Sequence, residues 1–354
     1  MEPQVTHTVG STAAATKSAD GASGHHLTNL VDWRRYIATD PTPATPLASS
    51  AYRQMTPAER ETYDENRLDH HARLLVVATS TVRHTVTCGR RLVLLNRHAI
   101  SARRGLIVSG PANTGKTIAV TQLGRSHELL DRARHPHSTD RIPVIYITVP
   151  PAATARMVAV EFARFLGLPV YGRSSKNITD VIEAVVGVLA TARTGLVIVD
   201  EVHNISLTTR NGAEVSDTLK YFSERIAATF VYAGIDIEHS NLLTGTRGAQ
   251  IAGRFSLINT APFPYGSEWQ ALVATLEDTL LLHDHKHGSL SSIDRYLHTL
   301  TGGMIGALSH AIRGAAIDAI LTGTEKITKK GIEAVPLDHN AVTSRPGRKT
   351  AAHR

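Results

Sequence analysis

The sequence predicts an α/β fold in which a parallel sheet lies between layers of helices, and three observations support this prediction. Apolar strand-like runs alternate with helical stretches from about residue 105 to residue 260, as in strands joined by crossover helices. A glycine-rich loop with a phosphate-binding pattern follows the first of these runs, at 110–117. Another run, 196–199, is apolar and is followed by two carboxylates at 200 and 201, as expected for a central strand covered on both faces.

The loop at 110–117 reads Gly-Pro-Ala-Asn-Thr-Gly-Lys-Thr and fits G-x-x-x-x-G-K-[ST]. Its glycines let successive backbone N–H groups turn toward phosphates, and a helix that starts near Gly115 adds its positive dipole end. Lys116 can reach the β and γ oxygens of a nucleoside triphosphate, and Thr117 is placed to ligate Mg²⁺. An ordinary glycine turn is the alternative. The predicted nucleotide-binding residues are Gly110, Pro111, Ala112, Asn113, Thr114, Gly115, Lys116, Thr117 and Ile118.

Two acids, Asp200 and Glu201, end the apolar run that begins at Leu196. In a phosphate-binding-loop protein the end of this strand lies beside the loop. Asp200 is then expected to hold the hydrated Mg²⁺, and Glu201 to orient and polarise the attacking water. Without the loop upstream, the same pair would be read as a solvated strand end.

Composition gives the broad class of the protein. The chain has 354 residues, of which 42% are hydrophobic, enough for one large domain and a smaller one. A single cysteine, Cys88, excludes an intrachain disulfide and a multi-cysteine zinc site. Neither a secretory signal pattern nor an apolar run of membrane-spanning length is present. We therefore expect a cytoplasmic protein without a membrane partner.

The chain is basic, with a formal net charge of +7 and an isoelectric point near 9.6. Such a charge is compatible with nucleic acid as a partner, and equally with an ordinary solvated surface. The sequence also holds 19 histidines. We expect the group His283, His285 and His287, and the pairs at 25–26 and 70–71, to be solvated and not to bind metal.

The N-terminal part divides into three pieces. Residues 1–26 have few large apolar side chains, and we expect them to be disordered. A short cluster containing Trp33 and Tyr36 follows, which either docks a partner or packs back on the main domain. Thr56, Pro57 and Glu59 form a helix start with a capping box, and the helix is expected to continue into Val82.

Periodicity and turn residues assign the remaining elements. The expected strands are 105–108, 142–149, 196–200, 230–234 and 255–260, and the expected helices of the same region are 117–130, 154–166, 178–192 and 215–226. From Trp269 onward only helices are expected, at 268–283, 291–300, 304–321 and 328–335. The predicted domains are an N-terminal segment 1–55, disordered or docking a partner, an ATPase core 56–262, a helical lid 263–336 and a basic tail 337–354.

An α/β core of this kind followed by a small helical bundle is the organisation of AAA+ ATPases. Within them the chain resembles the TniB-type transposition ATPases, relatives of the TnsC and Mu B target-selection proteins, over roughly residues 65 to 335. The blocks that carry the resemblance are GPANTGKT (110–117), a strand ending in proline (144–150), LVIVDEVHN (196–204), FVYAG (230–234), GRF (253–255) and TGGMIGALSHAIRGAAIDAI (301–320).

The resemblance implies roles for further residues and partners. Arg254, in the Arg-Phe element, matches the arginine finger that reaches the γ-phosphate of a neighbouring subunit, so activity would require a homo-oligomer, a ring or a filament. A surface arginine at a helix end is the alternative. Together with ATP and Mg²⁺, such a protein would assemble on duplex DNA, select the target, and recruit or activate an integrase-type transposase. The implied catalytic set is Lys116, Asp200, Glu201 and Arg254.

Two departures from the AAA+ pattern predict slow hydrolysis. Ile235 stands where a small polar residue should sense the γ-phosphate, and Asp236 is the first polar residue after it. The lid lacks its sensor arginine, since Arg313 lies well beyond Gly303. The alternatives are therefore an initiator- or helicase-loader-like ATPase, or a nucleotide-dependent binding switch with negligible hydrolysis.

No helix-turn-helix or zinc module is evident in the sequence, so any contact with DNA is expected to be with the backbone and independent of base sequence. The candidates are basic positions between the second strand and the Asp-Glu strand, with a fully solvated face as the alternative. They are Arg156, Arg164, Arg173 and Lys176.

Overall fold

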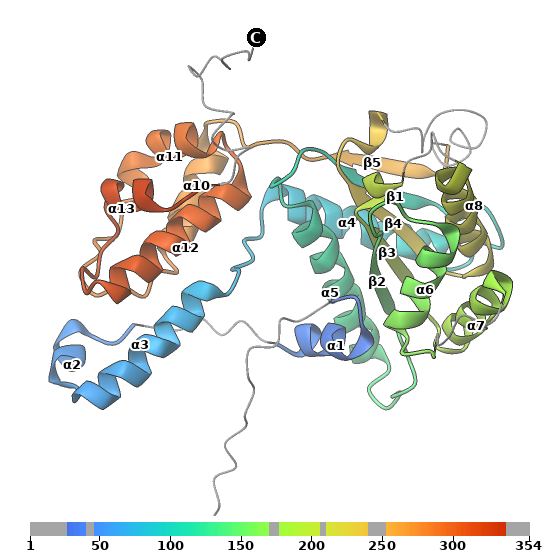
Figure 1. Cartoon of the computed structure of the whole chain (residues 1–354), viewed down its shortest axis with the longest axis horizontal. Helices are drawn as coiled ribbons and strands as arrows, with labels where there is room; N and C mark the ends of the chain where they lie inside the picture. The colour runs from blue at the N-terminus through green and yellow to red at the C-terminus, as the bar shows by residue number, and fades with distance from the viewer. Residues whose placement is uncertain (1–26, 40–45, 170–176, 206–209, 240–252, 338–354) are drawn as a thin grey trace, which may run out of the picture.

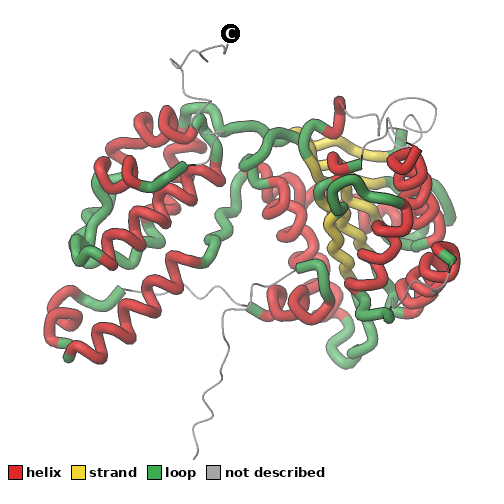
Figure 2. The backbone as a smooth tube through the Cα atoms, in the orientation of Figure 1, coloured by secondary structure: helices red, strands yellow, loops and turns green. Residues whose placement is uncertain are grey.

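The computed structural model describes residues 27–39, 46–169, 177–205, 210–239 and 253–337. A sheet flanked by helices forms one part of the molecule, and a bundle of C-terminal helices forms the other (Figures 1 and 2). The predicted disorder of 1–26 and the predicted basic tail fall almost wholly outside the described residues. None of the helices in the described ranges is both long enough and apolar enough to cross a membrane.

The sheet has five strands in the order β2-β3-β4-β1-β5, and every pairing is parallel. The register aligns Ser109 with Gly234 and Asn259, and Thr148 with Asp200. The carboxyl ends of these strands therefore meet along one edge, which confirms the predicted parallel sheet. The strands are β1 (Gly105–Ser109), β2 (Val144–Thr148), β3 (Leu196–Asp200), β4 (Thr229–Gly234) and β5 (Phe255–Asn259).

Helices cover both faces of the sheet and give three layers (Figure 1). Helices α4 (Ser80–Asn96) and α5 (Lys116–Arg134) lie on one face, and α6 (Ala155–Phe165), α7 (Ile178–Thr191) and α8 (Arg210–Arg225) on the other. The helices pack closely against one another as well as against the sheet: the rings of Phe162 and Phe222 stack with centroids 4.4 Å apart. Burial on both faces explains why β1 and β3 are apolar nearly throughout.

The N-terminal cluster packs back on the main domain, which decides between the two alternatives for Trp33. This residue lies in α1 (Leu30–Ala38) and is fully buried. Its indole Nε1 donates a hydrogen bond to Glu128 Oε2 on α5 at 2.5 Å. Its ring stacks on that of Tyr146, with centroids 6.0 Å apart. Tyr36 also faces α5, since its hydroxyl accepts a hydrogen bond from Gln122.

The single helix predicted from Thr56 into Val82 is wrong. The predicted capping box is present at Thr56, but α3 (Pro57–Ala72) ends ten residues before Val82. An extended segment follows in which Leu75 and Val77 are partly buried while Leu74 and Val76 are exposed, the alternation typical of extended backbone. A new helix, α4, then begins after Thr79, whose side chain accepts from the backbone N–H of Val82.

The C-terminal helices have a hydrophobic core of their own, built around Trp269, Leu297 and Leu308. They are α10 (Ser267–Glu277), α11 (Asp294–Thr301), α12 (Ile305–Leu321) and α13 (Lys329–Ala334). The predicted helix 268–283 is too long, because α10 ends at Glu277. Helix α3 packs against α12, although the predicted division at residue 56 groups it with the ATPase core. That division stays a prediction.

Two of the histidines that were expected to be solvated are buried instead. His71 is buried, and its Nε2 accepts a hydrogen bond from the backbone N–H of Leu281 at 3.2 Å. The side chain of His285 is also buried, 3.1 Å from Glu277. Solvation was therefore wrongly predicted for these two residues, which are satisfied by core partners. His287 is exposed as predicted, and the pair at 25–26 lies outside the described residues.

Candidate functional site

The loop between β1 and α5 has the backbone conformation that an anion site requires. Gly110, Asn113 and Gly115 all have positive φ, at 144°, 63° and 88°. This conformation favours glycine, and asparagine tolerates it better than most residues do. Helix α5 begins at Lys116 without a side-chain cap, so its first N–H groups point at the loop cavity without an intrahelical partner. Such a helix start binds phosphate well.

A threonine that sequence reasoning missed anchors the loop. Thr260 follows β5, and its backbone N–H donates to Ser109 O at 2.7 Å. Its hydroxyl lies 2.6 Å from that of Thr114. A Cβ on Gly110 would stand 2.1 Å from Thr260 O, so the first glycine is required by close approach as well as by φ. The sequence held no signal for this contact between residues about 150 apart.

Lys116 is held close to the loop backbone. Its Nζ donates to Gly110 O at 2.8 Å and to Pro111 O at 2.6 Å. Burial lowers the pKa of Lys116, although nearby Asp200, Glu201 and Asp236 act in the opposite direction. Within the described ranges, these two carbonyl oxygens are the acceptors of the ammonium group, and phosphate oxygens could replace them.

Three hydrogen bonds orient the Asp200 carboxylate. The hydroxyl of Thr117 donates to its Oδ2 at 2.8 Å, and that of Tyr146 donates to the same oxygen at 2.9 Å. The backbone N–H of Glu201 donates to Oδ1 at 2.8 Å. Burial, reinforced by Asp200, raises the pKa of Tyr146, so its phenol remains a donor. Sequence reasoning missed Tyr146, which lies on the neighbouring strand β2.

Glu201 is held by His203, a second residue whose role the sequence did not reveal. Glu201 has a left-handed backbone conformation, φ 58° and ψ 34°, and His203 Nε2 lies 3.2 Å from its Oε2. His203 Nδ1 accepts from the backbone N–H of Ile235 at 3.3 Å, which assigns the proton to Nε2. His203 thus joins the end of β4 to the second acid.

A cavity of about 340 Å³ adjoins the loop and extends toward the C-terminal helices. Residues 112–118 and Glu201 line one side, and the extended segment 74–79 together with α12 lines another. The side away from the loop is mainly apolar, with Leu75, Leu276 and Ile305. The cavity therefore joins a charged end, suited to phosphates, to an apolar end.

Ser309 is a polar group within this otherwise apolar wall. It lies on α12, its residue is 6% exposed, and its hydroxyl has no hydrogen-bond partner among the described residues. The same helix touches the loop at its start, where the backbone N–H of Gly306 donates to Asn113 O at 3.1 Å. A buried hydroxyl without a partner destabilises the protein unless a ligand satisfies it.

Arg313 does not reach this cavity. Its Nε donates to His71 O at 2.8 Å, and its terminal nitrogen donates to Ala72 O, so it satisfies carbonyls at the end of α3. No arginine lies among the described residues that line the cavity.

Arg254 lies far from the loop of its own chain. Its carbonyl accepts from the N–H of Gly105 at 3.0 Å, at the amino end of β1, whereas the loop follows the carboxyl end. Arg254 is partly buried there and lines a separate hollow with Arg103 and Lys220. The structure brings together Lys116, Thr117, Asp200 and Glu201, and leaves Arg254 outside this group.

Two of the four candidate DNA-binding residues are described. Arg156 and Arg164 are exposed on α6, and Arg164 forms an ion pair of 2.5 Å with Glu161. Arg173 and Lys176 lie outside the described residues. The role of all four in DNA binding stays a prediction.

Comparisons with known proteins place this geometry in context. The sequence profile of a family described as "Bacterial TniB protein" matches residues 86–265, about half of the chain. A search of curated proteins gives no match.

Solved structures of origin recognition proteins are similar in fold. The ORC1 protein of Aeropyrum pernix in complex with DNA matches with a TM-score of 0.55 and 14% identity, over 74% of this chain and 65% of that one. The ORC2 protein of Aeropyrum pernix in its ADP form gives 0.57 and 17%, over 78% and 72%. Drosophila ORC bound to DNA gives 0.52 and 15%, over 84% and 69%. The chain thus spans about two thirds of these proteins, and the likeness confirms an AAA+ fold with C-terminal helices.

Proposed function

The chain belongs to the TniB family of bacterial proteins, and from this premise we propose that it is an AAA+ ATPase that regulates DNA transposition. The observation that carries the ATPase proposal is the 2.8 Å hydrogen bond between the Thr117 hydroxyl and Asp200. It joins the first helical turn after the loop to the strand that supplies the acids.

ATP would bind with its phosphates on the loop amides and with Lys116 turned from the loop carbonyls toward the β and γ oxygens. Thr117 Oγ1 is a hydroxyl oxygen and Asp200 Oδ2 is a carboxylate oxygen. Oxygen ligands of this type are the ones that Mg²⁺ prefers. The residues therefore fit this ion, which when bound would neutralise negative charge on the phosphates. Tyr146 keeps Asp200 oriented for this role.

Glu201 is the proposed base that orients and polarises the attacking water. The Nε2–H of His203 positions its carboxylate, and the other ring nitrogen contacts the backbone at Ile235. Ile235 itself stands at the position where a polar residue would sense the γ-phosphate. Hydrolysis is expected to be slow, because neither that polar residue nor a lid arginine contributes.

Arg254 is proposed to act on the nucleotide of a neighbouring subunit. Strand β1 separates it from the loop of its own chain by five residues at roughly 3.3 Å each, so it cannot contact phosphates there. A subunit boundary would bring the guanidinium to a neighbouring γ-phosphate, where such fingers are worth about 10³ to 10⁵ in rate. The active form would then be a homo-oligomer, a ring or a filament.

Mixing two inactive variants tests this role. Arg254→Ala and Glu201→Gln should each lose turnover alone, and the mixture should recover part of it if Arg254 completes a site that holds an intact Glu201. Failure to recover any activity would leave Arg254 with a structural role in its own subunit.

The proposed output of the ATPase is assembly on duplex DNA, choice of the target, and recruitment or activation of an integrase-type transposase in the cytoplasm. Family membership and the net charge of +7 support it. Two of the similar solved structures are of proteins bound to DNA.

Turnover measured with and without duplex DNA tests the proposal. We expect a slow basal rate that rises when DNA is added, and we expect ATP to tighten DNA binding. A protein that binds ATP and DNA yet hydrolyses none under either condition would be a nucleotide-dependent binding switch, an alternative that Ile235 and the missing lid arginine favour. No effect of ATP on DNA binding would reject assembly as the output.

A further inference from the structure

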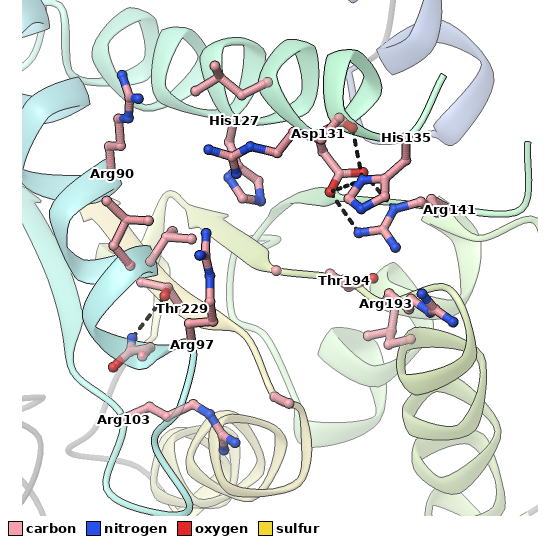
Figure 3. Close-up of a pocket in the computed structure, with 18 of the residues that line it drawn as sticks. Arg90, Arg97, Arg103, His127, Asp131, His135, Arg141, Arg193, Thr194 and Thr229 are labelled. Carbon is pink, nitrogen blue, oxygen red and sulfur yellow. Dashed lines mark hydrogen bonds and ion pairs between the residues drawn. The ribbon is translucent and has the colours of Figure 1, made fainter. Parts of the chain in front are cut away.

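A second hollow, of about 850 Å³, lies at the opposite end of the sheet from the loop. Its floor includes Gly195 and Thr229, which stand at the amino ends of β3 and β4. The final turns of α4, α5 and α7 form its walls. Figure 3 shows arginines on both sides of the space, with Arg90, Arg97 and Arg103 on one side and Arg141 and Arg193 on the other.

The charged side chains that line this hollow are predominantly cationic. Asp131 is the only carboxylate among its described lining residues, and it is already bonded to Arg141, through two contacts of 2.7 Å, and to His135. Burial lowers the pKa of His127 to about 4, so this ring adds no charge near neutral pH. The arginines that line the hollow are Arg90, Arg97, Arg103, Arg134, Arg141 and Arg193.

Most of this positive charge is not neutralised by the protein. Within the described ranges, no ion pair involves Arg90, Arg97, Arg134 or Arg193. The C-terminal ends of three helices face the hollow, and each contributes about half a negative charge. When Asp131 and these three half charges are subtracted from the six arginines, roughly 3.5 positive charges remain.

Arg103 gives an independent sign of a missing ligand. One of its terminal nitrogens donates to Ala99 O at 2.9 Å. Its Nε is buried and has no hydrogen-bond partner among the described residues. A buried donor without an acceptor costs stability, and each such group in a native structure calls for an explanation. An anion in the hollow would supply the acceptor.

We propose that this arginine hollow binds the phosphate backbone of duplex DNA, and the inference rests on the proposed function in transposition. Guanidinium groups bind phosphate through two parallel hydrogen bonds. Arg90, Arg97, Arg134 and Arg193 are exposed, and they come from three separate parts of the chain around the hollow. A single small anion would contact one or two of them, whereas successive phosphates of a strand contact several.

Two double variants test this assignment, one within the hollow and one outside it. Arg90→Ala with Arg97→Ala removes two arginines from the hollow. The control, Arg53→Ala with Arg91→Ala, removes two exposed arginines that do not line it, and Arg91 is the immediate neighbour of Arg90 on α4. Both changes lower the net charge equally. Binding of labelled duplex DNA is measured by fluorescence anisotropy over a salt series, with a non-hydrolysable ATP analogue filling the nucleotide site.

The hollow variant should weaken DNA binding and lower the slope of log affinity against log salt by about 1.8, since each lost phosphate contact contributes about 0.9. The control should keep the wild-type slope. If both variants changed DNA binding equally, or if neither changed it, the assignment of DNA binding to the hollow would be overturned. The proposed function would still stand in that case, because the wild type binds DNA. A wild type that binds no DNA would instead reject that function, and the hollow with it.

Discussion

The carboxyl and amino ends of the central sheet differ in which groups can bind an anion. At the carboxyl end, a helix begins behind a glycine-rich loop, so backbone N–H groups and one lysine suffice. At the amino end, helices terminate, and their dipoles oppose an anion. Side chains must supply the charge there, and six arginines line that hollow. Strand polarity therefore decides whether backbone groups or side chains must supply the positive charge for a phosphate.

The largest effect is expected from Lys116→Ala, which should abolish measurable ATP binding. The substitution removes the only cation among the described residues that line the loop cavity. Isothermal titration with ATP and magnesium measures the loss. Arg90→Ala is the matched control from the other end of the sheet, and it should bind ATP like the wild type. If Arg90→Ala weakened ATP binding as much, the two ends would not be separate sites.

A smaller effect is expected from His203→Ala. Without the Nε2–H contact, Glu201 loses its positioning group, and misplacement of a catalytic group by about 1 Å can cost up to 10²-fold in rate. We expect kcat for ATP hydrolysis to fall while KM changes little. His203→Gln keeps an N–H donor and should recover part of kcat. An equal loss in both variants would indicate that the ring serves only packing.

Tyr146→Phe should raise the magnesium concentration needed for half-maximal turnover by about tenfold, since a hydrogen bond to a charged group is worth roughly 1.5 kcal/mol at the lower end of its range. The change removes one donor to Asp200 and keeps the ring that stacks on Trp33. ATP turnover titrated with magnesium measures it, and more magnesium should be needed for half-maximal rate. Tyr232→Phe, in a buried tyrosine of β4, is the control and should leave the magnesium requirement unchanged.

Low pH should destabilise the protein because His127, which lines the hollow at the amino end of the sheet, resists protonation in the folded state. Its pKa is about 4 in the folded protein against an ordinary value of 6.5, because burial disfavours the charged ring. The unfolded chain therefore binds the proton first, and stability present above pH 6.5 is lost as pH falls toward 4. The loss between pH 7 and pH 5 is about 2 kcal/mol.

Urea unfolding at several pH values checks this sign. His127→Gln should flatten the acid side of the profile. A profile for His127→Gln as steep as that of the wild type would show that other groups cause the acid loss.

Sequence reasoning reached the parts of the site that are local in the chain. The loop at 110–117 and the acids at 200–201 are contiguous motifs, and each follows a recognisable strand. Tyr146 and Thr260 act across strands, so their contacts depend on sheet register, which composition does not reveal. The available signal for Tyr146 was a tyrosine in the middle of β2, between apolar neighbours.

The arginine hollow was beyond prediction for a different reason. Arg90, Arg97, Arg134 and Arg193 are separated by up to about 100 residues, and three of them stand at or just after helix ends. Cations are common at helix C-termini because they complement the dipole, so each one has an ordinary explanation alone. Only the parallel topology, which gathers the ends of α4, α5 and α7 at one edge, brings them together.

The most direct test of the account is ATP binding and turnover by Glu201→Gln, with magnesium present. The carboxylate is proposed to act on the attacking water and not to hold the nucleotide. We therefore predict that the variant binds ATP as tightly as the wild type and retains it unhydrolysed. If Glu201→Gln hydrolysed ATP as fast as the wild type, Glu201 would not be the catalytic carboxylate. That result would contradict the assignment of a hydrolytic site to Asp200 and Glu201 at the carboxyl edge of the sheet.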